Sequence, residues 1–190
     1  MTSQELLELK DDCDAIEIPS GRPHRIPAGT RLRLLQRLGD SYTVATELGD
    51  MLRINGKDAE ALGVTSSQAA EGPVSAFSEK LVWYRLKKIY DPEIPVNIVD
   101  LGLIYCCQIT PVDATYDINV KMTLTAPGCG MAEVLRADVE RVLAALPQVR
   151  EIHVEVVFDP PWKPNRMSEA AKLQLGLDLE TDSELPIYRQ

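Results

Sequence analysis

The segment Tyr116-Asp117-Ile118-Asn119-Val120-Lys121-Met122-Thr123-Leu124 alternates apolar and polar side chains from end to end. Such alternation is typical of a β-strand with one packed face and one polar or open face. Residues 130–146 follow with a single apolar stripe at helical spacing, and residues 150–158 alternate again. A strand–helix–strand unit of this kind crosses over right-handed, with its two strands parallel in one sheet.

The neighbouring segments extend this unit in both directions. Residues 102–110 predict an earlier strand, and the five residues between the two strands suit a hairpin. Residues 75–90 carry apolar side chains at helical spacings, with Ser75 as a candidate cap. Ser168 caps a predicted last helix. The sequence therefore predicts a two-layer helix and mixed-sheet domain over residues 75–176, in the order helix-strand-strand-helix-strand-helix.

The first third of the chain has a different texture. Short runs rich in β-formers alternate with Pro, Gly, Asn and Asp turn signals at spacings of about ten residues. This pattern predicts a small all-β unit over residues 1–65. Residues 66–74 are small and polar and are interpreted as a linker, and residues 177–190 as an acidic tail. The predicted fold class is α+β.

Composition excludes several classes of protein. The chain has 190 residues and a net charge of −9, with 29 acidic against 20 basic residues. This balance argues against a nucleic-acid partner, because phosphate binding needs a basic face. No apolar run reaches the ~18 residues of a membrane span, and the N-terminus lacks the pattern of a secretory signal. These features predict a cytoplasmic protein without a membrane partner.

Cys129 is the strongest candidate for a functional residue. It lies between Gly128 and Gly130, just before the predicted helix. A thiol at a helix N-terminus is favoured as a thiolate, which is both a nucleophile and a metal ligand. From the spacing alone, a turn cysteine that packs as a small apolar residue is an equally open interpretation.

The acidic loop before the first strand of the domain is a second candidate. Asp91, Glu93 and Asp100 could ligate a metal or orient a thiol, although acidic residues in a proline-rich turn usually face solvent or cap. A third candidate is Trp162, which follows Pro160-Pro161 after the last strand. It predicts either a rigid docking surface or simple packing beneath the loop.

The other cysteines and the two histidines carry weaker signals. Cys106 and Cys107 are adjacent on a predicted strand, so they point to opposite faces and cannot chelate one metal as a Cys-x-x-Cys pair would. By alternation, Cys107 shares a face with Leu103, Tyr105 and Ile109, and Cys106 with Ile104 and Gln108. A thiol enzyme would need a base, and only His24 and His153 are available.

Taken in order, the motifs resemble those of the SufT-type iron–sulfur assembly proteins, in the family that also includes PaaD and the eukaryotic cytosolic iron–sulfur targeting factor. They are Asp91-Pro92-Glu93-Ile94-Pro95, Asp100-Leu101-Gly102-Leu103-Ile104-Tyr105, Leu124-Thr125-Ala126-Pro127-Gly128-Cys129, and Pro160-Pro161-Trp162 with Ser168. The resemblance implies a non-enzymatic accessory factor of the SUF system in which Cys129 is the central residue. It also implies supporting positions at Asp91, Glu93, Asp100 and Thr125. Many relatives have proline where this chain has Gly130.

Two functional hypotheses follow from the resemblance, and a third from the thiol. In the first, Cys129 is a labile ligand for iron or a transient iron–sulfur cluster. One such thiolate cannot complete a four-thiolate cluster. The cluster would then be bridged within a homo-oligomer, expected to be a dimer, or completed by a partner or by small thiols. In the second, the chain is a metal-free adaptor whose Trp162 loop and β unit dock Suf scaffold or carrier proteins and apo iron–sulfur proteins. The third, a thiol enzyme, requires His153 to approach Cys129.

Overall fold

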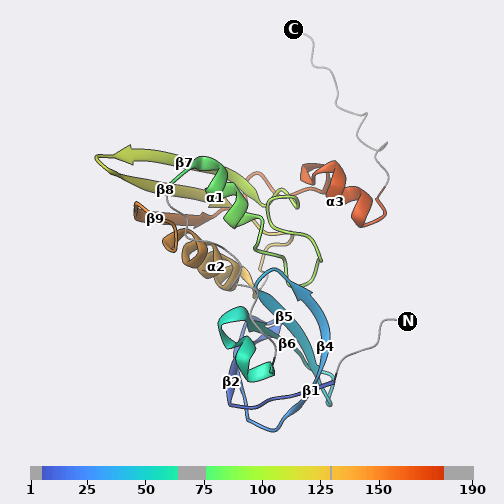
Figure 1. The fold of residues 1–190 in the computed structure, drawn as a ribbon. Coiled ribbons are helices and arrows are strands. Elements are labelled where there is room, and N and C mark those ends of the chain that lie inside the picture. Colours follow the sequence, from blue (N-terminus) through green and yellow to red (C-terminus); the bar gives the residue numbers. More distant parts are fainter. Residues whose placement is uncertain (1–5, 64–75, 129, 178–190) are drawn as a thin grey trace.

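The computed structural model describes residues 6–63, 76–128 and 130–177, and it contains two separate sheets (Figure 1). Predicted features at Ser75, at Cys129, across the proposed linker and in the acidic tail lie outside the described residues. The boundaries 1–65, 66–74, 75–176 and 177–190 therefore stay predictions. No helix in the described ranges is long and apolar enough to cross a membrane.

The first sheet has six strands in the order β1-β4-β5-β6-β2-β3, and every neighbouring pair is antiparallel. Tyr42, Val44, Leu52 and Ile54 alternate inward and form the centre of its core. A 3-10 helix, η1, follows the last strand, whereas the sequence predicted an all-β unit here. The elements are β1 (Leu6–Glu8), β2 (Cys13–Ile18), β3 (Pro23–Ile26), β4 (Arg31–Leu38), β5 (Ser41–Thr46), β6 (Met51–Asn55) and η1 (Gly56–Leu62).

The second sheet has three strands in the order β7-β8-β9. The middle strand pairs antiparallel with β7 and parallel with β9, which makes the sheet mixed. Helices α1 and α2 pack into the same core as the sheet. The elements are α1 (Glu79–Leu86), β7 (Ile104–Val112), β8 (Thr115–Met122), α2 (Ala132–Ala144), β9 (Val149–Val156), η3 (Pro164–Arg166) and α3 (Glu169–Gln174). The predicted α+β class and the order of helices and strands are confirmed.

Several predicted boundaries were wrong by a few residues. The β7–β8 turn consists of Asp113 and Ala114 rather than five residues, and Asp113 has a positive φ of 52°. Helix α1 is capped at Ser78, whose hydroxyl accepts the N–H of Leu81. Helix α2 begins at Ala132, two residues later than predicted.

Strand β7 departs from simple alternation. Its register steps from Ile104 opposite Met122 to Cys106 opposite Lys121, so two residues of β7 face one residue of β8. This β-bulge shifts the parity of the strand. Ile104 therefore packs against the core on the same side as Cys107, while Cys106 is exposed. The prediction that Ile104 shares a face with Cys106 was wrong because alternation cannot reveal a bulge.

Candidate functional site

The cysteine segment, residues 123–131, contains Cys129 and connects β8 to α2. Cys129 itself lies outside the described residues, and its neighbours are described. Thr125 is half-buried, Gly128 is exposed with a φ of 78°, and Gly130 is exposed. Met131 is fully buried and precedes the first helical turn, where its side chain makes no capping hydrogen bond. The first turn of α2 therefore follows a glycine-rich segment without a side-chain cap at this position.

Asp91 holds the acidic loop together from within. Its carboxylate accepts the backbone N–H groups of Glu93 and Ile94, each at 2.9 Å. Asp91 is buried, whereas Glu93 is exposed. Burial raises the pKa of Asp91, although the two N–H groups and the charge of Arg53 act in the opposite direction. The two acidic residues of this turn therefore have different surroundings, and Asp91 shapes the loop.

Asp100 ties three parts of the fold together. Its carboxylate accepts hydrogen bonds from Asn97 Nδ2 at 2.6 Å and from Lys87 Nζ at 3.3 Å. Its backbone carbonyl accepts the N–H of Ser168, the residue that caps α3. Burial raises the pKa of Asp100, but hydrogen bonds from Asn97, Lys87 and Ser168 and the charge of Lys87 outweigh it, so the pKa is lowered. Asp100 thus joins the end of α1 to the start of α3.

Trp162 is half-buried against the core, and its indole N–H donates to the carbonyl of Leu101 at 2.9 Å. The preceding Pro160 carbonyl accepts the hydroxyl of Tyr105 at 2.8 Å. These bonds fix the proline-rich loop to the start of β7. Phe158 is the more exposed aromatic residue of this loop, with 43% of its surface accessible. The sequence placed Phe158 at the end of the predicted strand 150–158, whereas β9 (Val149–Val156) ends two residues earlier.

No group of three or more His, Cys, Asp and Glu side chains suited to a metal ion occurs within residues 6–63, 76–128 and 130–177. Asp91 and Asp100 instead bind N–H groups of their own chain. The described acidic residues therefore do not form a metal site by themselves.

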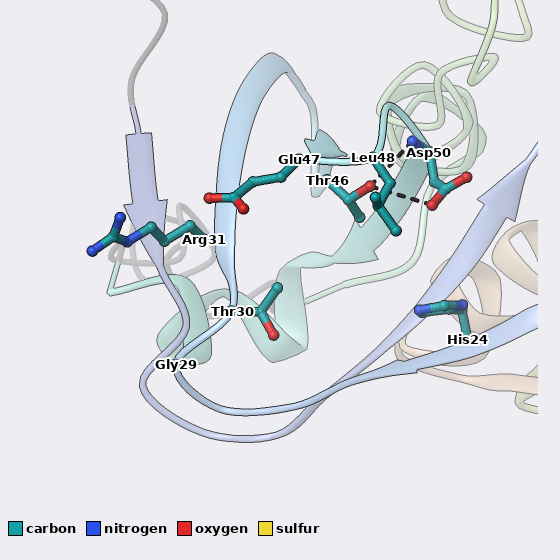
Figure 2. Close-up of a pocket in the computed structure, with 8 residues that line it drawn as sticks. All are labelled: His24, Gly29, Thr30, Arg31, Thr46, Glu47, Leu48 and Asp50. Atoms are coloured by element: carbon teal, nitrogen blue, oxygen red, sulfur yellow. Dashed lines mark hydrogen bonds between the residues drawn. The ribbon is translucent and has the colours of Figure 1, made fainter.

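A cleft of about 570 Å³ lies on the first sheet (Figure 2). Thr46 donates its hydroxyl to Asp50 Oδ2 at 3.3 Å and accepts the Asp50 N–H at 3.1 Å, so these polar groups satisfy each other. Strand β5 begins at Ser41, which lies beside the second unit, the part of the chain from α1 to α3. The strand ends at Thr46 in this cleft, and its six residues span about 17 Å. The cleft is therefore remote from the candidate loops. It is lined by His24, Gly29, Thr30, Arg31, Thr46, Glu47, Leu48 and Asp50.

Comparisons with known proteins identify the second unit. The sequence profile described as "Iron-sulfur cluster assembly protein" matches residues 79–156. A "Fe-S protein maturation auxiliary factor" of Porphyromonas gingivalis is 43% identical over 91 residues, 48% of this chain and 84% of the relative. The chain belongs to the iron–sulfur cluster assembly protein family.

Two further relatives of this iron–sulfur cluster assembly protein have similar identity. The Bacillus subtilis "Fe-S protein maturation auxiliary factor YitW" is 39% identical over 92 residues, 48% of this chain and 87% of the relative. The Staphylococcus aureus "Fe-S protein maturation auxiliary factor SufT" is 39% identical over 89 residues, 47% of this chain and 98% of the relative. The predicted resemblance to SufT-type proteins is confirmed.

The family match extends from α1 to β9 and includes Asp91, Glu93, Asp100, Thr125 and Cys129. The first sheet and the Trp162 loop lie outside it. The iron–sulfur cluster assembly protein therefore carries a six-stranded unit outside the matched region.

Arg53 is the residue of this extra unit that sequence reasoning missed. It lies on β6, and its Nη2 donates to Asp138 Oδ2 on α2. Both residues are only 4% exposed. Asp138 Oδ1 also accepts Arg141 Nη2 at 3.2 Å. Alternation with Leu52 and Ile54 places Arg53 on the outer face of its sheet, where a sequence pattern predicts solvent. Only the tertiary arrangement shows that α2 lies there.

Proposed function

We propose that the chain is an accessory factor in the maturation of iron–sulfur proteins, with Cys129 as a labile ligand for iron or a cluster in transit. The observation that carries the proposal is the near-complete coverage of relatives named as maturation auxiliary factors at about 40% identity. The substrate is the metal or cluster itself, and no bond-making chemistry is assigned to the chain.

The supply of ligands supports transient binding. Cys129 offers one thiolate per chain, and a cluster of the common type needs four. The carboxylates of Asp91 and Asp100 accept hydrogen bonds from N–H groups of the chain itself. Additional ligands must then come from a second copy, a partner protein or small thiols. Cargo held in this way is released more readily than cargo in a complete protein site.

The proposed partners are Suf scaffold or carrier proteins and apo iron–sulfur proteins, in the cytoplasm. These assignments come from the resemblance and from the names of the relatives. Sharing of the cluster between two copies of this chain, as a homodimer, belongs to the same proposal.

Anaerobic reconstitution with ferrous iron and sulfide tests the role of Cys129. The parent chain should gain visible absorption, and Cys129→Ala should lose it. Cys106→Ala is the matched control because Cys106 is an exposed free cysteine outside the cysteine segment. Equal loading of the parent and Cys129→Ala would contradict the proposal. Native mass measurement of the loaded sample would give the number of chains per cluster.

An adaptor without metal is the second candidate. The exposed Phe158, on a loop pinned by Tyr105 and Trp162, favours it. A rigid loop with an exposed aromatic ring is suited to docking a partner. Capture of a Suf scaffold that survives Cys129→Ala but fails in Phe158→Ala would favour the adaptor over the metal carrier.

A further inference from the structure

Three contacts of the first sheet with the second unit, among the described residues, lie in a row, one on β6 and one beyond each of its ends. Arg53, in the middle of β6, pairs with Ile16 of β2 and Thr43 of β5. The Met51 end of β6 lies beside Ile18, which leads into the β2–β3 turn. Its Asn55 end lies beside Ser41, which follows the β4–β5 turn. The two turns therefore lie beyond opposite ends of β6, with Arg53 between them.

Each turn approaches the backbone of the second unit so closely that a side chain would not fit. At the β2–β3 turn, a Cβ added to Gly21 would lie 1.9 Å from the carbonyl oxygen of Gly130. In the other direction, a Cβ on Gly130 would lie 2.2 Å from the carbonyl oxygen of Ser20. At the β4–β5 turn, a Cβ on Gly39 would lie 2.2 Å from the carbonyl oxygen of Lys88. Such approaches require glycine.

The contacted residues border the two candidate loops. Lys88 precedes the acidic loop that Asp91 organises, and Gly130 directly follows Cys129 in the chain. Asp138, the partner of Arg53, lies on the helix that begins after the cysteine segment. We infer that the first sheet is a positioning unit, which holds the acidic loop and the start of α2 in a fixed relation through Gly39, Arg53 and Gly21.

The central contact is electrostatic and buried. The carboxylate of Asp138 accepts hydrogen bonds from both Arg53 and Arg141. The positive charge of Arg53 also acts to lower the pKa of Asp91, against the larger effect of burial. Arg53 Nε and Nη1 have no hydrogen-bond partner within the part of the chain that the structure describes. A buried guanidinium in this state depends strongly on its carboxylate partner. Arg53 thus joins the first sheet to α2, and it acts through other residues rather than on the cargo.

This inference rests on the proposed function only for the meaning of the cysteine segment. The positioning itself can be measured without metal, through the reactivity of the Cys129 thiol. Trypsin cleaves after Lys121 and Arg136, which places Cys129 on a peptide without another cysteine. Labelling by iodoacetamide can then be followed by mass spectrometry in the full-length chain. Cys106, which is exposed, is the internal reference.

Gly21→Ala is compared with Gly29→Ala. Both glycines have positive φ angles, 72° and 79°, so both substitutions carry the same kind of backbone strain. A Cβ on Gly29 has no atom within 4 Å, whereas a Cβ on Gly21 meets Gly130. Gly21→Ala should speed labelling of Cys129 by about fivefold or more, the factor expected for about 1 kcal/mol of lost local stability. Gly29→Ala should match the parent chain.

Equal Cys129 labelling rates in folded Gly21→Ala and Gly29→Ala would overturn the inference. Arg53→Lys provides a second comparison that avoids the glycines, with Arg150→Lys as its control, because Arg150 pairs with Asp117 at the surface. Arg53→Lys should speed labelling and Arg150→Lys should not. If Gly21→Ala does not fold, this pair decides by the same criterion.

Iron loading of the same variants separates the two proposals. Faster Cys129 labelling in Gly21→Ala and Arg53→Lys, in a chain whose parent takes up no iron, would support the positioning unit and reject the iron-carrier function. Iron uptake by the parent, with unchanged Cys129 labelling in both variants, would support the iron-carrier function and overturn the positioning unit.

Discussion

Asp91 and Asp100 were both predicted to support the cysteine, and their surroundings push their pKa values in opposite directions. Burial raises the pKa of Asp91, so its contribution to stability is full below about 3.8, the unfolded value, and is lost as the pH rises through the folded value. For Asp100 the hydrogen bonds and Lys87 outweigh burial and lower the pKa. Its contribution is present above about 3.8 and is lost as the pH falls through the folded value.

Substitution of Asp100 tests the direction of its pKa shift. Asp100→Asn should lower the free energy of unfolding by about 1 kcal/mol near pH 7, because the charged hydrogen bonds to Lys87 and Asn97 are weakened. The loss should shrink as the pH falls below about 3.8 and the parent carboxylate itself becomes protonated. Urea unfolding at several pH values measures it, with the exposed Glu93→Gln as control. A loss that does not change with pH would contradict the assignment.

The candidate residues were found from the sequence because they form motifs in a fixed order. Their bonding partners could not be found in this way. Asn97, Lys87 and Ser168 come together around Asp100 only when α1 and α3 are in place. Trp162 was correctly recognised as a distinctive residue, but the bond from its indole to Leu101 depends on contacts far along the chain.

At the scale of elements, strong periodicity predicted the type and order of the helices and strands of the second unit. The boundaries of the elements, and the face of the sheet on which each side chain lies, were less predictable because they depend on neighbouring strands. The bulge in β7 illustrates the reason, since the extra residue is visible only against the register of β8. Alternation along β7 alone assigns Ile104 to the wrong face.

Alanine substitutions on β7 test which of its side chains face the core. Ile104→Ala should lower the free energy of unfolding by about 1–2 kcal/mol, because Ile104 packs against the core from a partly buried position. Cys106→Ala should change it by less than about 0.5 kcal/mol, because Cys106 is exposed. Urea denaturation of the two variants gives both values. Similar costs for the two substitutions would contradict the bulged register.

At the scale of the whole molecule, two sheets with separate cores meet at contacts that include the Arg53–Asp138 ion pair and close backbone approaches at Gly21 and Gly39. The sequence predicted two units of the correct types. It did not predict their contact, because Ser41, Thr43 and Arg53 on the outer face of the first sheet are usual surface residues, although Ile18 and Ala45 on the same face are apolar and also buried. Their burial is a property of the assembled chain.

A double-mutant cycle tests the central ion pair. Arg53→Met should destabilise the chain by about 3 kcal/mol, because Asp138 stays buried without its main partner. Arg53→Met combined with Asp138→Leu should recover most of this loss, since no buried charge then remains at the pair. Urea unfolding of the parent, both single variants and the double variant completes the cycle. Strictly additive losses would show that the two side chains do not interact.

The close fit of Gly21 on Gly130 also determines which pieces of this protein can be studied separately. A fragment that starts at α1 would keep every element of the family match. It would also expose the carbonyl of Gly130 and the carboxylate of Asp138, which the complete chain covers with Ser20, Gly21 and Arg53. Thiol reactivity and partner binding measured on that fragment would describe a newly created surface beside Cys129, so shortened genes are poor substitutes for the full-length one.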